Sequence, residues 1–347
     1  MSRLIQKGLV GATLLTLSLS VLGCGRSAAD KNVINVYSAR HYDTDEAIYD
    51  DFTEKTGIEI QLVEGKSDEL IERLKSEGEN SIADVFLTVD AGRLWRAEQS
   101  GILQAAESEV LAERVPENLR HPENLWFGLT TRARVLVYNP SKVKPEELST
   151  YEALAEPQWK GRVCVRSSSN IYNQSLLGSM IESNGLEATE TWAKGLVYNF
   201  VRPPQGGDTD QIKAVAVGSC DVAIANHYYV ARIQKSENPK NQEIAKNIAV
   251  FFPNQEDRGT HVNISGAGVT ANAPNKEGAI KFIEHLVSAE SQKRFALSNN
   301  EYPAVEEVEP DPALAKYGDF KIDAVNVSSY GKNSPEAVKL ADRAGWK

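Results

Sequence analysis

The stretch VINVYSARHYDTDEAIYDDFTEKTG, residues 33–57, has the pattern of a strand followed by a helix. Its opening run, residues 33–39, is rich in β-branched and apolar side chains, which predicts a strand. Residues 43–45 offer N-caps for a helix, the apolar side chains that follow have helical spacing, and Gly57 provides the residue that ends it. A strand followed directly by a helix is typical of α/β proteins, whose strands pair in parallel through helical crossovers.

The same alternation continues in two series along the chain, whose 347 residues are about twice the length of one ordinary domain. We therefore expect two α/β lobes with a ligand site between them, outside the carboxyl ends of the strands. The predicted strands and extended segments are 58–63, 83–90, 126–140, 162–166, 219–225, 247–253 and 263–270. The predicted helices are 67–78, 91–101, 147–155, 171–185, 187–200, 209–218 and one long helix over 275–297.

The composition and the motif content argue against several classes of protein. Lys and Arg number 38 and Asp and Glu number 48, and a net charge of −10 argues against a general nucleic-acid binder. Three cysteines are too few for a Cys-rich zinc or iron–sulfur scaffold. The motifs G-x-S-x-G, H-E-x-x-H and the P-loop do not occur, and the serines at 167–169 have no evident paired base. We therefore expect a binding protein rather than an enzyme.

The N-terminal residues 1–24 have the layout of an export signal. Arg3 and Lys7 precede an uncharged apolar run that is too short to favour a permanent membrane span. The run ends in V-L-G-C, which resembles a bacterial lipoprotein processing box with Cys24 as the lipidated residue. The alternative is ordinary cleavage near residues 28–29, with Cys24 discarded. Either way, we expect a periplasmic protein, and a lipid anchor would tie it to a membrane.

Export changes the net charge of the mature chain and the number of cysteines that remain free to pair. Loss of Arg3 and Lys7 moves the net charge from −10 to −12. Once Cys24 is lipidated or removed, Cys164 and Cys220 remain as an even pair in an oxidising compartment, which predicts a disulfide between them. Two buried free thiols are the alternative.

Tyrosines follow three of the predicted strands at the edge where a ligand is expected. Tyr42 follows the strand at 33–39, Tyr172 follows the strand at 162–166, and Tyr228 and Tyr229 follow the strand at 219–225. Each tyrosine has a simpler alternative role in packing against a neighbouring helix, but the adjacent pair is hard to explain in that way. Their side chains point in different directions, so at least one is expected to face the cleft.

Several tyrosines at one point fit either an aromatic cage for a cation or sugar, or a hard, highly charged metal. Phenol has a pKa of about 10, so phenolate forms at neutral pH only with strong help, and Fe³⁺ gives that help. Four phenolates and one Fe³⁺ sum to −1, and Arg40 or Arg232 is placed to balance the remainder unless it is a plain surface charge. His41 and His227 are too few for zinc to be preferred.

Six segments of the chain resemble one known family along nearly the whole mature length. The chain is similar to the periplasmic ferric-iron-binding proteins of bacterial iron ABC transporters, and most of all to the cyanobacterial FutA (IdiA-like) group. The segments that carry the resemblance are YSARHYDTDEAIYDDFTEKTGI (37–58), ADVFLTVDAGRLWRAEQSGIL (83–103), WFGLTTRARVLVYN (126–139), SSSNIYNQSLL (167–177), VRPPQGGDTDQIKAV (201–215) and HYYVAR (227–232).

The resemblance implies a bilobal α/β fold of the periplasmic solute-binding type (class II), with two discontinuous lobes joined by crossover strands. We expect residues 30–131 with 260–305 to form the N-terminal lobe. Residues 132–259 with 306–347 are expected to form the C-terminal lobe. The implied function is binding of Fe(III) in the interlobe cleft and delivery of the iron, by a monomer, to an inner-membrane ABC permease. Two alternatives remain: binding of another small anion or organic ligand, and sequestration of iron during stress.

The resemblance also assigns roles to individual residues of the predicted site. His41 matches a position that coordinates iron in some relatives and stays outside the coordination shell in others. Arg232 matches an arginine beside the paired tyrosines, Arg40 is our own electrostatic addition, and His227 receives no role. Four tyrosines make a separate anion unnecessary, although one is compatible with the site. The tyrosines that match ligand positions of the family are Tyr42, Tyr172, Tyr228 and Tyr229.

Overall fold

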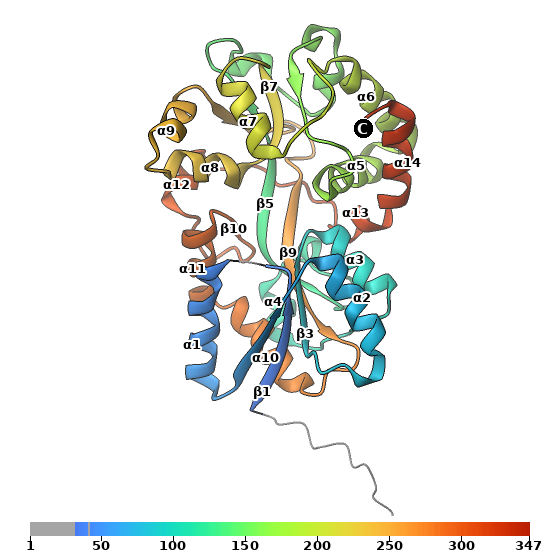
Figure 1. Ribbon diagram of the computed structural model, residues 1–347, viewed down its shortest axis with the longest axis vertical. Helices are drawn as coiled ribbons and strands as arrows, with labels where there is room; N and C mark the ends of the chain where they lie inside the picture. Colours follow the sequence, from blue (N-terminus) through green and yellow to red (C-terminus); the bar gives the residue numbers. More distant parts are fainter. Residues whose placement is uncertain (1–31, 41) are drawn as a thin grey trace, which may run out of the picture.

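Two α/β lobes stacked along the long axis make up the molecule (Figure 1). The computed structural model describes residues 32–40 and 42–347. Two long strands, β5 (Phe127–Tyr138) and β9 (Val262–Thr270), run between the lobes and join them. The bilobal α/β fold expected from the sequence is confirmed.

The first lobe is built on the parallel strands predicted from residues 33–90. Strand β1 (Val33–Ser38) pairs in parallel with β2 (Glu59–Glu64) on one side and with β3 (Val85–Val89) on the other. Strand β9 then pairs antiparallel with β3, which brings a late segment of the chain into this sheet. The remaining elements here are α1 (Glu46–Thr56), α2 (Ser67–Glu77), α3 (Ala91–Gln99), β4 (Leu103–Gln104), α4 (Glu109–Arg114), α10 (Lys276–Leu286), α11 (Ala289–Asn299) and β10 (Tyr302–Pro303).

Strand β5 serves the sheets of both lobes. Its first half pairs antiparallel with β9, and its second half pairs antiparallel with β7 (Val222–Asn226) and β8 (Ala249–Phe251). The second lobe is completed by β6 (Val163–Cys164), α5 (Ile171–Asn184), α6 (Leu186–Tyr198), α7 (Asp208–Ala216), α8 (His227–Lys235), α9 (Pro239–Lys246), α12 (Pro312–Ala315), α13 (Ser328–Lys332) and α14 (Ser334–Ala344). Short 3-10 turns lie at Asp43–Asp45, Gly78–Asn80, Glu117–Leu119, Pro145–Glu147, Glu152–Ala155 and Pro157–Trp159.

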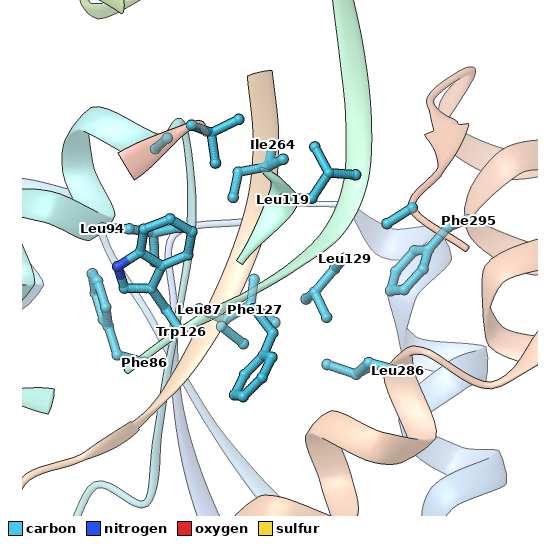
Figure 2. Packing of buried hydrophobic residues seen from close by; sticks show 14 of the residues in the cluster. Phe86, Leu87, Leu94, Leu119, Trp126, Phe127, Leu129, Ile264, Leu286 and Phe295 are labelled. Carbon is cyan, nitrogen blue, oxygen red and sulfur yellow. The ribbon is translucent and has the colours of Figure 1, made fainter. Parts of the chain in front are cut away.

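Large apolar side chains fill the interior of each lobe. In the first lobe, Trp126, just before β5, lies beside Phe86 and Leu94, whereas Phe127, the first residue of β5, lies towards Leu129 and Leu286 (Figure 2). The second lobe has its own cluster, with three tryptophans at its centre, Trp159, Trp192 and Trp346.

The C-terminal tail returns to the junction of the lobes. Helix α13 packs against α3 of the first lobe and α5 of the second. Gly331 makes this approach possible, because a Cβ at that position would lie 2.1 Å from the Cβ of Trp95. The tail therefore touches both lobes, and the lobe boundaries given above stay a prediction.

Three local expectations differ from the structure. The long helix predicted over 275–297 is divided into α10 and α11, because the Ser288 side chain caps a new helix by accepting a hydrogen bond from the Ser291 amide at 3.3 Å. The helix predicted over 147–155 is replaced by 3-10 turns. The Asp45 carboxylate does not cap α1, because it binds Arg40 instead.

The predicted disulfide is confirmed. Cys164 in β6 is bonded to Cys220, which lies just before β7, and their Cα atoms are 6.0 Å apart. In the described part of the chain, no helix is long and apolar enough to cross a membrane. Cys24, the predicted lipidation site, lies outside the described residues.

Loss of this disulfide should destabilise the protein. The bond closes a loop with a sequence separation of 56 residues, and chain entropy then predicts a loss of about 4 kcal/mol in the free energy of unfolding for the Cys164→Ser, Cys220→Ser double variant. Urea denaturation of oxidised wild type and of the double variant measures this difference, with reduced wild type as the matching control. Equal unfolding free energies would contradict a stabilising role for the bond.

Candidate functional site

The three second-lobe tyrosines form one cluster. The hydroxyl oxygens of Tyr172 and Tyr228 are 3.3 Å apart, and the rings of Tyr228 and Tyr229 have centroids 4.3 Å apart. Tyr228 is buried, whereas Tyr172 and Tyr229 are partly exposed. The cluster therefore presents phenol groups from two different helices at one point.

Local sequence explains how the tyrosines reach this point. Helix α5 begins after Asn170, whose side-chain oxygen accepts a hydrogen bond from the Tyr172 amide at 3.0 Å. Helix α8 begins directly after β7, so Tyr228 and Tyr229 occupy its first turn. The partial positive charge at a helix N-terminus favours negative groups nearby, and both helices direct it towards the phenols.

Tyr42 belongs to the first lobe, and Arg232 links it to the cluster of the second lobe. The guanidinium of Arg232 lies 5.6 Å from the ring centre of Tyr42 and 5.1 Å from that of Tyr228. Arg232 is itself exposed, but its guanidinium spans the tyrosines of the two lobes. All four tyrosines singled out from the sequence are thus brought together between the lobes. His41 lies outside the described residues.

Arg40 also lies against the ring of Tyr42, and it is buried in the interior of the protein. Its guanidinium is 4.7 Å from the ring centre of Tyr42 and forms buried ion pairs with Asp45 at 2.9 Å and Glu301 at 3.1 Å. The positive charge of Arg40 is therefore already matched by carboxylates. Arg40 is therefore not alone in the role expected of it, which was to balance the negative charge of the phenolates.

Sequence reasoning missed Arg132 and Glu301. Arg132 is fully buried in β5 and donates a hydrogen bond to the carbonyl of Ile264, and its Nε is 3.8 Å from a carboxylate oxygen of Glu301. Its charge acts on the phenols of Tyr42, Tyr172 and Tyr228. The signal was available in the run TTRARV, because two arginines two positions apart share one face of a strand that contains no other charged residue.

The second arginine of that run, Arg134, fixes the starts of both tyrosine-bearing helices. Its guanidinium donates to Asn173 at 2.7 Å, to Asn226 at 2.8 Å and to Asp208 at 2.9 Å. Asn173 follows Tyr172, and Asn226 is the N-cap of α8, so one buried side chain sets the relative position of the two helices.

His227 is a structural residue. Its ring is fully buried and its nitrogens face the backbone of Ala133 at 3.1 Å and of Asn300 at 2.9 Å. Burial lowers the pKa of His227 to about 4, so the ring is neutral at pH 7.

The phenols of Tyr42, Tyr228 and Tyr229 are protonated in the absence of a bound cation. Burial, together with the neighbouring tyrosines, raises the pKa of Tyr228 well above its usual range and raises that of Tyr229 to about 12. Burial also raises the pKa of Tyr42, although Arg40 and the other arginines oppose this. Only a strongly charged cation will displace these protons at neutral pH.

Other kinds of metal site do not occur in the described chain. Within residues 32–40 and 42–347, no group of three or more His, Cys, Asp or Glu side chains is arranged to hold a metal ion. A pocket of about 750 Å³ lies elsewhere, on the second lobe, where Glu152, Trp192 and Arg258 are among the residues that line it. The tyrosine cluster is therefore the arrangement with the clearest metal chemistry.

Comparison with known proteins identifies the family to which this chain belongs. The family model described as bacterial extracellular solute-binding protein matches residues 47–322. The chain belongs to the bacterial extracellular solute-binding protein family.

Named relatives of this solute-binding protein act on iron. It is 53% identical to iron uptake protein A1 of Synechocystis, over 97% of this chain and 94% of the relative. It is 30% identical to the Fe(3+)-binding periplasmic protein of Serratia marcescens, over 96% of each chain. The solved structure of Trichodesmium IdiA (FutA) with iron and citrate has 61% identity and a TM-score of 0.89, and the match covers 91% of this chain and all of that one. The resemblance to ferric-iron-binding proteins is confirmed.

The buried carboxylate of Glu301 should make stability depend on pH. Burial raises the pKa of Glu301, but Arg40 and Arg132 outweigh that effect and hold the pKa below its usual range. A folded-state pKa below the unfolded value gives stability that is present above about pH 4.3 and is lost as the pH falls through the folded value. Glu301→Gln should therefore cost about 3–5 kcal/mol at pH 7, and the cost should shrink in acid.

Urea denaturation between pH 7 and pH 3 measures this loss. Glu306→Gln is the matched control, because Glu306 is exposed on the same segment. A gap between wild type and Glu301→Gln that is constant with pH would show that the ion pairs of Glu301 do not contribute to stability.

Proposed function

We propose that this protein binds Fe(III) between its lobes through the phenolates of Tyr42, Tyr172, Tyr228 and Tyr229. The proposal rests on one observation, the gathering of four phenols that follow three separate strands: Tyr172 and Tyr229 contact Tyr228, and the guanidinium of Arg232 lies over both Tyr228 and Tyr42. The relatives named above bind iron, and the Trichodesmium structure contains it, which supports the same cargo here.

Charge and ligand hardness favour Fe(III) over softer or less charged metals. Oxygen donors suit hard cations, and three positive charges offset much of the cost of deprotonating phenols whose pKa is raised. Four phenolates around Fe³⁺ leave a net charge of −1. Arg232 lies against the ring of Tyr228, and the buried Arg132 acts on the same phenols. Their positive charges therefore offset the excess negative charge of the site.

We assign His41 as a fifth ligand candidate, because it directly precedes Tyr42. Arg40 and Arg232 act outside the coordination shell, where each stacks on the ring of Tyr42. The four phenolates satisfy the charge of the metal without a separate anion, and the site remains compatible with one.

Capture and closure follow from the arrangement of the ligands. The second lobe carries three of the four tyrosines, so it holds the metal first. Closure of the lobes about β5 and β9 then adds Tyr42 and excludes water. Reduction to Fe²⁺ weakens binding, since phenolate prefers the higher charge. Docking on an inner-membrane ABC permease favours opening and release.

The family acts outside the cytoplasm, and the N-terminal residues agree with that location. We assign residues 1–24 to an export signal, with Cys24 as the site of a lipid anchor, and we expect the mature protein to work as a monomer without enzymatic activity. Iron sequestration under stress uses the same site, and iron uptake by a deletion strain distinguishes sequestration from transport. Binding of a different small anion or organic ligand is tested by calorimetry.

Replacement of Tyr229 by Phe should weaken the site severely. Wild-type protein should develop a visible phenolate-to-iron charge-transfer band on addition of Fe³⁺, and Tyr229→Phe should lower the affinity by at least about 100-fold, since it removes a charged ligand. Tyr198→Phe is the matched control, because Tyr198 is 61% exposed on the second lobe. A colourless titration of wild type would exclude the iron site, and wild-type affinity in Tyr229→Phe would show that the ligand is a different residue.

Replacement of Cys24 by Ala should release the protein from the membrane. A single thioether-linked lipid needs this cysteine, so the variant should move from the membrane fraction to the soluble periplasmic fraction and lose incorporation of labelled fatty acid. Fractionation of cells that express each form measures the change. Wild type in the soluble fraction would contradict the lipid anchor and leave export by ordinary cleavage.

A further inference from the structure

Asp90 combines two unfavourable features at one position. It follows β3 and caps α3, and its backbone has φ 83° and ψ 124°, which side-chain-bearing residues rarely adopt. Its carboxylate is also fully buried. Both features are unfavourable on their own, and this indicates that the surrounding contacts hold Asp90 in place.

The carboxylate of Asp90 connects three parts of the fold. The Oδ1 atom accepts two hydrogen bonds, one from the Gly92 amide at 2.9 Å and one from the Ser175 hydroxyl at 2.6 Å. The other oxygen accepts from the Asn263 side chain at 3.0 Å. These donors belong to α3 of the first lobe, to α5 of the second lobe and to β9, which joins the lobes.

The donors to Asp90 are neutral, which distinguishes it from the other buried carboxylates near the site. Asp208 is paired with Arg134 and Arg166, and Glu301 is paired with Arg40. A buried carboxylate that relies on neutral donors is sensitive to the loss of any one of them.

The contact between Asp90 and Ser175 crosses the lobes close to a predicted iron ligand. Ser175 lies three residues after Tyr172, so the two side chains project from adjacent turns of α5. Helix α3 meets α5 closely here, because a Cβ at Gly92 would lie 3.0 Å from the side chain of Ile171. The lobe arrangement and the position of Tyr172 are therefore coupled through one short hydrogen bond.

We propose that Asp90 is a positioning residue that holds α5, and with it Tyr172, in the closed arrangement through its hydrogen bond with Ser175. This inference rests on the proposed function, because its purpose is to retain Fe(III) once the lobes have closed. The hydrogen bond forms only when the lobes are together, so it slows opening and leaves capture by the open form unchanged.

Ser175→Ala tests this contact with a small change. Ser179→Ala is the matched control, because Ser179 is also buried in α5, one turn further on, and its hydroxyl donates a hydrogen bond within the helix, to the Leu176 carbonyl at 2.9 Å. Fe(III) is loaded as ferric citrate, and its release to excess EDTA is followed by loss of the charge-transfer band. Association rates are measured separately, and urea denaturation records the stability of each variant.

Ser175→Ala should release iron about tenfold faster than wild type and should bind iron at least as fast, because a hydrogen bond to a buried carboxylate is lost from the closed form alone. Ser179→Ala should release iron at the wild-type rate. A merely structural role would lower the stability of Ser175→Ala without changing iron release. Equal release rates for the two variants would overturn the proposal.

A second measurement separates this proposal from the proposed function. If wild-type protein takes up no Fe(III), the proposed function fails, and the contact is judged from small-angle scattering of the iron-free proteins, which exchange between open and closed forms and make the Asp90–Ser175 hydrogen bond only in the closed form. Ser175→Ala should then have a larger radius of gyration than wild type and Ser179→Ala. Equal radii would overturn the role of Asp90 in holding the lobes together.

Discussion

Strand β5 belongs to the sheets of both lobes, so its position determines how the two lobes and the buried arginines are arranged. Its twelve residues are all buried, and the strand pairs with β9 in one lobe and with β7 and β8 in the other. A shift of this strand would change the register of both sheets at once. The two arginines on one of its faces therefore have fixed positions, Arg132 behind the phenols and Arg134 at the starts of α5 and α8.

The pairing of opposite charges explains why so many buried charges are tolerated around strand β5. Arg134 is matched by Asp208, and Arg40 is matched by Asp45 and Glu301, so the interior carries charge in hydrogen-bonded pairs. Buried phenols among these pairs are neutral until a cation arrives. Such an arrangement discriminates by charge, since a weakly charged cation does not compensate for deprotonation.

The sequence predicted the parallel strands of the first lobe, the bilobal fold and the meeting of the four tyrosines, because these follow from periodicity and from strand ends. It also predicted the disulfide, because export leaves an even pair of cysteines. It did not predict the break at Ser288, which depends on a local capping bond that competes with a continuous helix. Glu301 and Asp90 were also missed. Their importance comes from partners far away in the chain, Arg40 and Ser175, and no local pattern marks such pairs.

The disulfide connects the two segments that lead to three of the four tyrosines. Cys164 lies in β6, which leads to the helix of Tyr172, and Cys220 precedes β7, which leads to the helix of Tyr228 and Tyr229. A covalent bond thus ties β6 to the residue just before β7, the two strands that lead to the helices carrying three of the phenols. This half of the site is preorganised, so a cation that arrives there meets an assembled surface, and only the movement that brings Tyr42 requires further ordering.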